Sequence, residues 1–246
     1  MNYNTDRFKE QLSQLNIELT DEQIDQFIRY YELLVETNKV MNLTAITEYD
    51  EVFTKHFIDS ISIVKSDAFK SLMKSNTKIS VIDMGTGAGF PGLPIKIAFP
   101  NIRLTLADSL AKRIRFLDQV IDELELSDVE TVHGRAEDLG HNKAYREKYD
   151  ICVSRAVANI ATLSEYCLPL VKKDGYFISY KTAGIDDELA ESGKAVAILG
   201  GRVENIDRYT LPLSDIDRSL LIINKEKNTS NKYPRKAGTP GKEPLK

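Results

Sequence analysis

The chain has 246 residues, enough for one large domain or for a domain with a small appendage. Its 42% hydrophobic and 28% charged residues are typical of a soluble globular protein, and no stretch is apolar over the roughly 18 residues that a membrane-spanning helix needs. Two cysteines are too few for a disulfide framework, and neither they nor the three histidines show metal-ligand spacing. We therefore expect a cytoplasmic protein, by default a monomer, without a metal site or a membrane partner.

The charge is unevenly distributed along the chain. The net charge of −4 disfavours a nucleic-acid partner, but between Lys225 and Lys246 there are seven basic residues and only two acidic ones. A basic segment on an acidic body can contact phosphates despite the overall sign. The alternative is a solvated, disordered terminus. We treat residues 227–246 as a basic C-terminal tail.

The first part of the chain is predicted to be helical. Residues 5–40 have helical spacing, and Thr20 and Gln23 fit a capping box at the start of a second helix. That helix carries one apolar stripe: Ile24, Phe27, Ile28, Tyr31, Leu34 and Val35. Residues 1–75 are expected to form a helical extension that packs on the main domain.

A turn at Asn42-Leu43-Thr44 should precede a further helix that Thr47 caps. This helix carries His56 and Asp59 close together, although a single helical histidine is more often structural than catalytic. The polar Lys65–Lys78 stretch is expected to link the helical unit to the first strand.

The stretch Ile79–Gly92 carries the first functional signal. A β-branched run typical of a buried strand leads to Asp83 and then to Gly85, Gly87 and Gly89. Glycines directly after such a strand allow a sharp turn and a close approach of the backbone to a ligand. Pro91–Ala98 can open a helix whose free N–H groups favour an anionic or polar ligand.

A second strand, Ile102–Ala107, ends in Asp108, about 20 residues beyond the glycines, where an acidic side chain can bind ribose hydroxyls. Phe90 stands where a dinucleotide fingerprint has its third glycine, which argues against NAD. Ser109 can cap the next helix. The G-x-G-x-G pattern followed by this acidic residue indicates an adenosine-containing cofactor and resembles the class I S-adenosylmethionine-dependent methyltransferases.

From Ile79 onward strands and helices alternate, which predicts an α/β, Rossmann-like, mostly parallel doubly wound sheet over residues 76–226. The further predicted strands are Val129–His133, Tyr149–Ser154, Tyr176–Tyr180 after a turn at Asp174-Gly175, and an antiparallel pair, Val203–Tyr209 and Leu220–Asn224. Ligands bind beyond the carboxyl ends of such strands. The predicted cofactor residues are Asp83, Gly85, Gly87, Gly89, Phe90, Asp108, Ser109, Ala136, Glu137 and Arg155.

The residues permit some methyl-transfer reactions better than others. Cys152 and Cys167 lie in apolar stretches, so neither looks like the nucleophile that methylation of pyrimidine C5 needs. The loop after the fourth strand lacks the Asn/Asp-Pro-Pro-aromatic pattern of adenine-amine methylation. Methylation of a sugar hydroxyl would leave Lys181 as the general-base candidate. Guanine N7 carries a lone pair and no proton, so it requires alignment alone, which gives it a modest preference.

Several motifs together resemble the RsmG (GidB) family of bacterial 16S rRNA guanine-N7 methyltransferases, from about Tyr31 to Leu245. The motifs are Asn42-Leu43-Thr44, His56–Ser60, Gly85–Leu93, Asp108–Arg113, Arg135-Ala136-Glu137, Ser154-Arg155-Ala156 and, the most specific, the tail Lys232–Pro240.

The resemblance implies S-adenosylmethionine as methyl donor, a guanine in the decoding-centre loop of 16S rRNA as acceptor, and low-level streptomycin resistance on loss of the enzyme. It implies cofactor contacts at Gly85, Phe90, Ala136, Glu137 and Arg155. We expect Lys232, Arg235 and Lys236 to bind RNA, and Arg155 to orient cofactor or base, without a general base. Asn42, Thr44 and His56 either line the base pocket or pack the helices.

Two rival readings remain open at this point. One is a small-molecule methyltransferase whose tail is only a solvated terminus. The other is a non-catalytic ribosome-assembly factor with a vestigial cofactor site.

Overall fold

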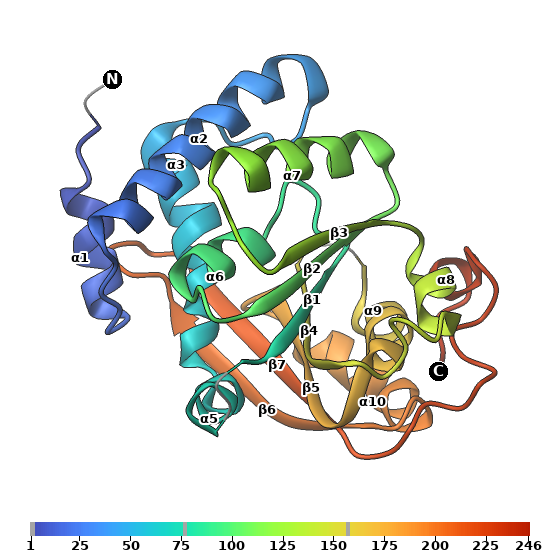
Figure 1. Ribbon diagram of the computed structural model, residues 1–246. Coiled ribbons are helices and arrows are strands. Elements are labelled where there is room, and N and C mark those ends of the chain that lie inside the picture. Colours follow the sequence, from blue (N-terminus) through green and yellow to red (C-terminus); the bar gives the residue numbers. More distant parts are fainter. Residues whose placement is uncertain (1–2, 76–77, 156–157) are drawn as a thin grey trace.

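A seven-stranded sheet forms the centre of the computed structural model, which describes residues 3–75, 78–155 and 158–246 (Figure 1). The strand order is β3-β2-β1-β4-β5-β7-β6. Neighbouring strands from β3 to β5 run parallel, whereas β7 is antiparallel to both β5 and β6. The predicted doubly wound sheet with an antiparallel end is therefore confirmed. The strands are β1 (Ser80–Met84), β2 (Arg103–Asp108), β3 (Val129–His133), β4 (Tyr149–Arg155), β5 (Val171–Thr182), β6 (Gly201–Thr210) and β7 (Asp217–Lys225).

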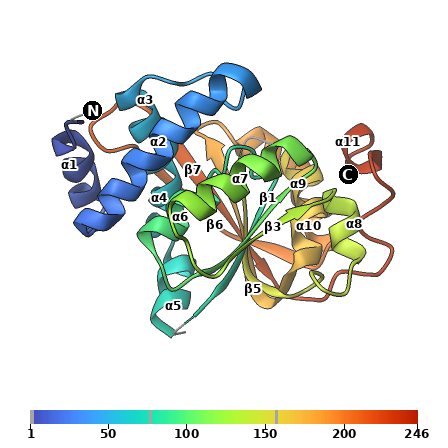
Figure 2. The ribbon, with the colours of Figure 1, turned by 45° about the horizontal axis from the view of Figure 1, so that its top comes forward.

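Two apolar clusters cover the two faces of the sheet, because side chains alternate along each strand. On β1, Val81 belongs to the cluster that contains the N-terminal helices, whereas Ile82 and Met84 belong to the other cluster. The first face is covered by α6 (Gly92–Ala98) and α7 (Ala111–Glu123), and the second by α8 (Ala136–His141), α9 (Ile160–Cys167) and α10 (Asp186–Ile198) (Figures 1 and 2). A 3-10 turn, η3 (Leu168–Leu170), connects α9 to β5.

The N-terminal helices lie on the same side of the sheet as α6 and α7, and α2 packs against both (Figure 2). They are α1 (Asp6–Gln14), α2 (Asp21–Met41), α3 (Tyr49–Val52), the π-helical η1 (Phe53–Ile58), α4 (Asp59–Ile61), the 3-10 turn η2 (Ser62–Lys65) and α5 (Asp67–Ser75). The predicted capping box is present, since Thr20 Oγ1 accepts from the N–H of Gln23 and Gln23 accepts from the N–H of Thr20. Gln23 also donates to the carbonyl of Ile97, which ties the start of α2 to the end of α6.

Two local predictions about helix starts are wrong. The short helix α3 begins after Glu48 without a side-chain cap, whereas the carbonyl of Thr47 accepts from Tyr31. Helix α7 begins after Leu110 rather than Ser109. The nearby carboxylate of Asp108 accepts from the N–H of Leu110 and takes the place that the serine was expected to fill.

Two predicted connections contain more regular structure than expected. The expected polar link before the first strand contains helix α5, whose Phe69 is buried and packs edge-on against Phe99 with ring centroids 5.3 Å apart. The segment therefore forms a helix because its apolar side chains have helical spacing, although most of its residues are polar. At the expected turn, Asp174-Gly175, the structure continues β5 but with an irregularity: Asp174 has a left-handed φ of 67°, and the pairing slips from Tyr149–Val171 to Ile151–Tyr176.

The basic C-terminal tail is folded onto the second face, beside α8 and α9, and ends in a short helix, α11 (Thr239–Lys242) (Figure 2). Its Tyr233 is buried in the apolar cluster of that face. The division of the chain at residues 75 and 226 stays a prediction. No helix within the described part of the chain is long and apolar enough to span a membrane.

Candidate functional site

The glycine loop after β1 forms the floor of the site. Gly85, Gly87 and Gly89 have φ angles of 73°, 64° and 100°, a region that side chains with a Cβ rarely adopt. A Cβ on Gly89 would lie 2.5 Å from Leu93 Cδ1 and 2.5 Å from Tyr30 Oη, whereas one on Gly87 would meet nothing within 4 Å. Gly89 is thus required by packing, and Gly87 leaves the backbone open to a ligand.

Asp83 holds this loop from inside the protein. Its Oδ2 accepts from Thr86 Oγ1 at 2.7 Å and from the N–H of Gly92 at 2.8 Å, while its Oδ1 has no hydrogen-bond partner among the described residues. Burial raises the pKa of Asp83 to about 7. Asp83 does not line the cavities described below, so it shapes the loop; its predicted contact with a cofactor stays a prediction.

Asp108 lies at the end of β2, as predicted, and is almost fully buried. Its carboxylate accepts from the N–H of Gly87 at 3.0 Å, from the N–H of Leu110 at 2.9 Å and from Arg113 Nη1 at 3.1 Å. The glycine loop and the start of α7 are therefore fixed to one carboxylate.

Two adjoining cavities open at the carboxyl ends of the strands. The larger, about 930 Å³, has walls from the glycine loop, the N-terminal helices and the ends of β4 and β5. The smaller, about 300 Å³, lies between the ends of β1 and β2, the start of α8 and the tail. Gly85, Asp108 and Ser109 line both cavities. Of the other predicted cofactor residues, Gly87, Phe90 and Arg155 line the larger cavity, and Ala136 and Glu137 line the smaller one.

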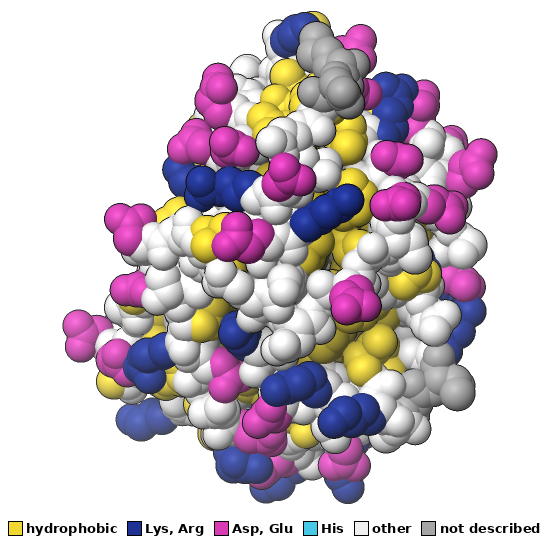
Figure 3. Space-filling view, turned by 90° about the vertical axis from the view of Figure 1, so that its left-hand side faces the viewer, with side chains coloured by type: hydrophobic (Ala, Val, Ile, Leu, Met, Phe, Trp, Pro, Cys, Tyr) yellow, Lys and Arg dark blue, Asp and Glu magenta, His cyan; other side chains and the backbone are white. Residues whose placement is uncertain are grey.

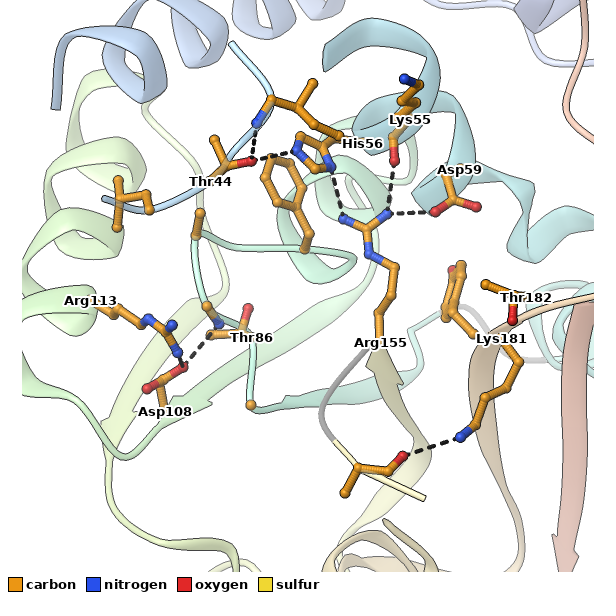
Figure 4. A pocket seen from close by; sticks show the side chains of 18 of the residues that line it. Thr44, Lys55, His56, Asp59, Thr86, Asp108, Arg113, Arg155, Lys181 and Thr182 are labelled. Carbon is orange, nitrogen blue, oxygen red and sulfur yellow. Dashed lines mark hydrogen bonds and ion pairs between the residues drawn. The ribbon is translucent and has the colours of Figure 1, made fainter. Parts of the chain in front are cut away.

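Arg155 projects from the end of β4 into the wall of the larger cavity (Figure 4). Its Nη1 donates to Asp59 Oδ2 at 2.8 Å and to the carbonyl of Lys55 at 3.4 Å, and its guanidinium carbon lies 5.2 Å from the centre of the Phe90 ring. Asp59 is buried and also lies 3.3 Å from Arg218 Nε. The orientation of Arg155 is thus set by the π-helical turn η1 and its neighbours.

His56 completes this wall and stacks on Phe90 with ring centroids 4.5 Å apart (Figure 4). Its Nδ1 lies 3.4 Å from Arg155 Nη2, and its Nε2 lies 2.9 Å from Thr44 Oγ1. Because a guanidinium can only donate, Nδ1 accepts and the ring proton is on Nε2. Burial, followed by the charge of Arg155, lowers the pKa of His56 to about 3, so the ring is neutral at physiological pH.

The residues of the motif Asn42-Leu43-Thr44 have different roles. Thr44 lines the larger cavity and accepts from His56 and from the N–H of Ile46, so both of its oxygen lone pairs are used. Asn42 does not line the cavity but ends α2 in the left-handed conformation, with φ of 49°. Asn38, which sequence reasoning missed, orders the loop because its Oδ1 accepts from the N–H groups of Leu43 and Thr44.

Two further residues hold the walls of the cavity. Lys181, the general-base candidate of the sequence, lies at the end of β5 and donates to the carbonyl of Ala158 and to Glu188 Oε1. Tyr30, which sequence reasoning missed, donates to the carbonyl of Ala88 in the glycine loop, and its position within α2 gave no local signal for this contact. Asp59, by contrast, lies three residues from His56, a spacing that places both on one helical face.

The two cysteines are fully buried, one on β4 and one on α9, and neither lines the cavities, which confirms them as core residues. Ser154 Oγ donates to the carbonyl of Met84 and joins β4 to the end of β1. Ala156, the third residue of the Ser154-Arg155-Ala156 motif, lies outside the described residues. No cluster of potential metal ligands occurs within the described ranges.

The predicted RNA-binding residues of the tail are in different environments. Lys232 and Lys236 are exposed. Arg235 is half-buried and its guanidinium forms an ion pair with Glu165 on α9, with Nη2 2.7 Å from Glu165 Oε2. Its binding to RNA stays a prediction, but its side chain already has a partner within the protein.

Comparison with known proteins shows the family of this chain. The family described as rRNA small subunit methyltransferase G (GidB) matches residues 23–219. A ribosomal RNA small subunit methyltransferase G from Alkaliphilus oremlandii is 54% identical over 98% of each chain. One from Lactobacillus helveticus is 50% identical over 98% of this chain and 99% of that protein.

Among solved structures, an O-methyltransferase from neocarzinostatin biosynthesis, in complex with S-adenosyl-L-homocysteine, shares the fold. It has a TM-score of 0.50 and 17% identity, and the match covers 65% of this chain and 51% of that one. The full-length relatives and the matched domain together establish that the chain belongs to the rRNA small subunit methyltransferase G family.

Proposed function

We propose that the protein transfers a methyl group from S-adenosylmethionine to N7 of a guanine in the decoding-centre loop of bacterial 16S rRNA, acting in the cytoplasm as a monomer. The observation that carries the proposal is the pair of adjoining cavities at the carboxyl ends of the strands. Cavities of this size hold small-molecule ligands. The full-length relatives named for small-subunit rRNA methylation support the choice of substrate.

The residues present fit an adenosyl cofactor. The space above Gly87 is open, and the carboxylate of Asp108 lies beside it, where the remaining acceptor site on Oδ1 can accept from a ribose hydroxyl. We assign the purine to the smaller cavity, beside Ala136 and Glu137, and the sulfonium end to the side of Phe90 and Arg155. S-adenosylmethionine supplies an electrophilic methyl group when bound.

The chain's own residues would then bind and align the acceptor. Phe90 and His56 form a flat stacked pair at the cavity wall, suited to a base that leaves the RNA stack. Arg155 is held by Asp59 and by the carbonyl of Lys55. Its guanidinium therefore needs little reorganisation when the substrate binds.

Among the described residues of the wall, neither His56 nor Lys181 is an available general base. Both nitrogens of His56 have partners, and Lys181 is a donor to Glu188 and to the carbonyl of Ala158. Attack by a guanine N7 lone pair needs no proton removal, whereas methylation of a hydroxyl or an amine benefits from a base. The larger cavity therefore favours N7.

Lys232 and Lys236 are the tail residues best placed to contact RNA phosphate, because they are exposed on a segment next to the smaller cavity. On the face formed by the N-terminal helices, acidic and basic side chains are interspersed (Figure 3). That face therefore has no uniformly basic surface of the kind that RNA attracts, and we propose the tail side as the RNA side.

Purified protein should transfer label from methyl-labelled S-adenosylmethionine to small ribosomal subunits, or to naked 16S rRNA, from cells lacking this gene. The Arg155→Gln variant should lose most of this transfer. Labelling of small molecules but not of rRNA would favour a small-molecule methyltransferase. Failure to bind the cofactor in calorimetry would favour a non-catalytic assembly factor.

A further inference from the structure

The C-terminal tail forms part of the smaller cavity, a role distinct from RNA binding. Gly238 lines this cavity together with Ala136, Glu137 and Tyr166. Its N–H donates to Glu137 Oε1 at 2.8 Å. Gly238 has φ of 82°, and a Cβ placed on it would meet nothing within 4 Å. The backbone of the tail therefore borders open space beside the residues assigned to the purine.

A buried ion pair fixes the tail in this position. Glu165 on α9 has no solvent exposure, and its carboxylate accepts from the N–H of Arg235 at 2.7 Å, from Arg235 Nε at 2.9 Å and from Arg235 Nη2 at 2.7 Å. All hydrogen bonds found for the Glu165 side chain in the described part of the chain come from Arg235. A buried carboxylate that loses its partner is strongly destabilising, so the pair holds the segment against α9.

Contacts on both sides of Arg235 extend this anchor. His141 Nε2 on α8 donates to the carbonyl of Pro234 at 2.7 Å, and Arg146 donates to the carbonyl of Tyr233 at 2.9 Å. A Cβ on Gly140 of α8 would lie 2.5 Å from Pro234 Cγ, which shows how closely the tail approaches this helix. Beyond Gly238, Thr162 Oγ1 on α9 donates to the carbonyl of Pro240 at 3.0 Å.

We infer that residues 233–238 form one wall of the binding site for the adenosyl group, with Gly238 at the purine and the Arg235–Glu165 ion pair as the positioning device. This inference rests on the proposed function, because it assumes that the cofactor binds at the glycine loop. The ligand is a purine nucleoside group. The backbone of the tail forms part of the surface of its binding site. Arg235 acts through the tail backbone and does not itself contact the ligand.

The test measures the affinity of the full chain for S-adenosylhomocysteine by isothermal titration calorimetry. Gly238→Asn retains a residue type that tolerates positive φ but places a side chain in the cavity, and should weaken binding about tenfold or more. Arg235→Gln should weaken binding by a similar factor, because it releases the tail. Gly193→Asn on α10 and Arg202→Gln on β6 are exposed controls, and both should bind like the unchanged protein.

The outcomes separate the inference from the proposed function. If the unchanged protein does not bind S-adenosylhomocysteine, the proposed function fails. If it binds and the Gly238→Asn variant, folded by circular dichroism, binds equally well, the tail is not part of the site and the inference is overturned. If Arg235→Gln does not fold, Gly238→Asn alone decides, since its side chain meets open space.

Discussion

His56 lies between a hydroxyl, a guanidinium and an aromatic ring, and these contacts require its neutral form. Protonation would place a donor at Nδ1 against Arg155, which can only donate, and a second positive charge beside it. The burial and contacts that lower the pKa of His56 make it a poor base in the site, and they also make the folded protein sensitive to acid.

The first prediction concerns this acid sensitivity. The pKa of His56 is about 3 in the folded protein and near its ordinary value of about 6.5 in the unfolded chain. Between these values the unfolded state binds a proton that the folded state does not, so the free energy of unfolding falls as pH drops from 6.5 towards 3. His56 should contribute of the order of 1 kcal/mol per pH unit to this fall in the free energy of unfolding.

The measurement is urea unfolding of the unchanged protein and of His56→Phe at several pH values from 7 to 4.5. Phenylalanine retains a ring to stack on Phe90 but cannot titrate. The unchanged protein should lose stability more steeply below pH 6.5. Parallel curves would mean that His56 is protonated in the folded protein.

The second prediction concerns Asp59, which is buried between Arg155 and Arg218. Asp59→Asn should lower the free energy of unfolding by about 3 kcal/mol, because it leaves the half-buried Arg155 without its charged partner. It should also reduce methyl transfer, because the orientation of Arg155 is lost. Both quantities can be measured on one preparation, by urea unfolding and by transfer of labelled methyl to rRNA.

Asp186→Asn is the matched control, since Asp186 pairs with Arg208 between exposed side chains. It should change the free energy of unfolding by less than about 1 kcal/mol. Equal effects of the two substitutions would contradict the role assigned to the buried pair.

At the scale of elements, the glycine loop joins β1, α6 and α2 at one point. Tyr30 of α2 donates to the carbonyl of Ala88 in this loop, and its ring stacks on Phe90 with centroids 5.5 Å apart. The N-terminal helices therefore support the loop directly, in addition to covering the sheet.

The third prediction tests this packing with Gly89→Ala. The new methyl group would clash with Leu93 and Tyr30, at a backbone conformation that disfavours a Cβ. We expect destabilisation of about 2 kcal/mol or more, with weaker cofactor binding. Gly193→Ala, in the exposed part of α10 where a Cβ meets nothing within 4 Å, should instead stabilise by up to about 1 kcal/mol. Thermal unfolding of both variants separates these effects, and equal melting temperatures would contradict the account.

Elements with strong local patterns could be predicted from the sequence. The residues Val129–His133 form β3 as predicted, and Thr20 caps α2 as predicted. The position of Asp108 at a strand end also followed from local pattern alone. Near the predicted turn at Asp174-Gly175, the sequence missed that Val171 already pairs with β4, because neighbouring strands are not visible in a local pattern.

The candidate site was predictable where residues follow strands, because parallel strand ends share one edge. The ion pairs that hold the side chains of the site and the tail in place could not be predicted. Arg155 pairs with Asp59 across 96 positions and Arg235 with Glu165 across 70. A charged residue in the sequence carries no sign of such a distant partner, so the basic charge and the tail motif predict RNA binding for Arg235 but not its pairing with Glu165.

At the scale of the whole molecule, the tail packs against the helices on the second face of the sheet. It supplies Tyr233 to an apolar cluster and Arg235 to a buried carboxylate. Lys225, at the end of β7, is fully buried and donates to the carbonyl of Val171 and to Thr229 Oγ1. The start of the tail is therefore also fixed.

The fourth prediction follows for a chain without residues 227–246. Its free energy of unfolding should fall by about 3 kcal/mol or more, because Glu165 is left buried without a partner. Adding Glu165→Gln to the shortened chain should recover part of the loss, since a neutral amide costs less to bury. Urea unfolding of the three chains makes the comparison. A shortened chain as stable as the full one would mean that the tail is a solvated terminus.

The central claim is methylation at guanine N7 in 16S rRNA. The most direct test is primer extension on 16S rRNA after borohydride and aniline cleavage at N7-methylguanine, in cells with the gene, without it, and with the Arg155→Gln variant. We expect a stop in the decoding-centre loop only in cells with the unchanged gene. Identical profiles in all three would contradict the assignment of N7 as the acceptor.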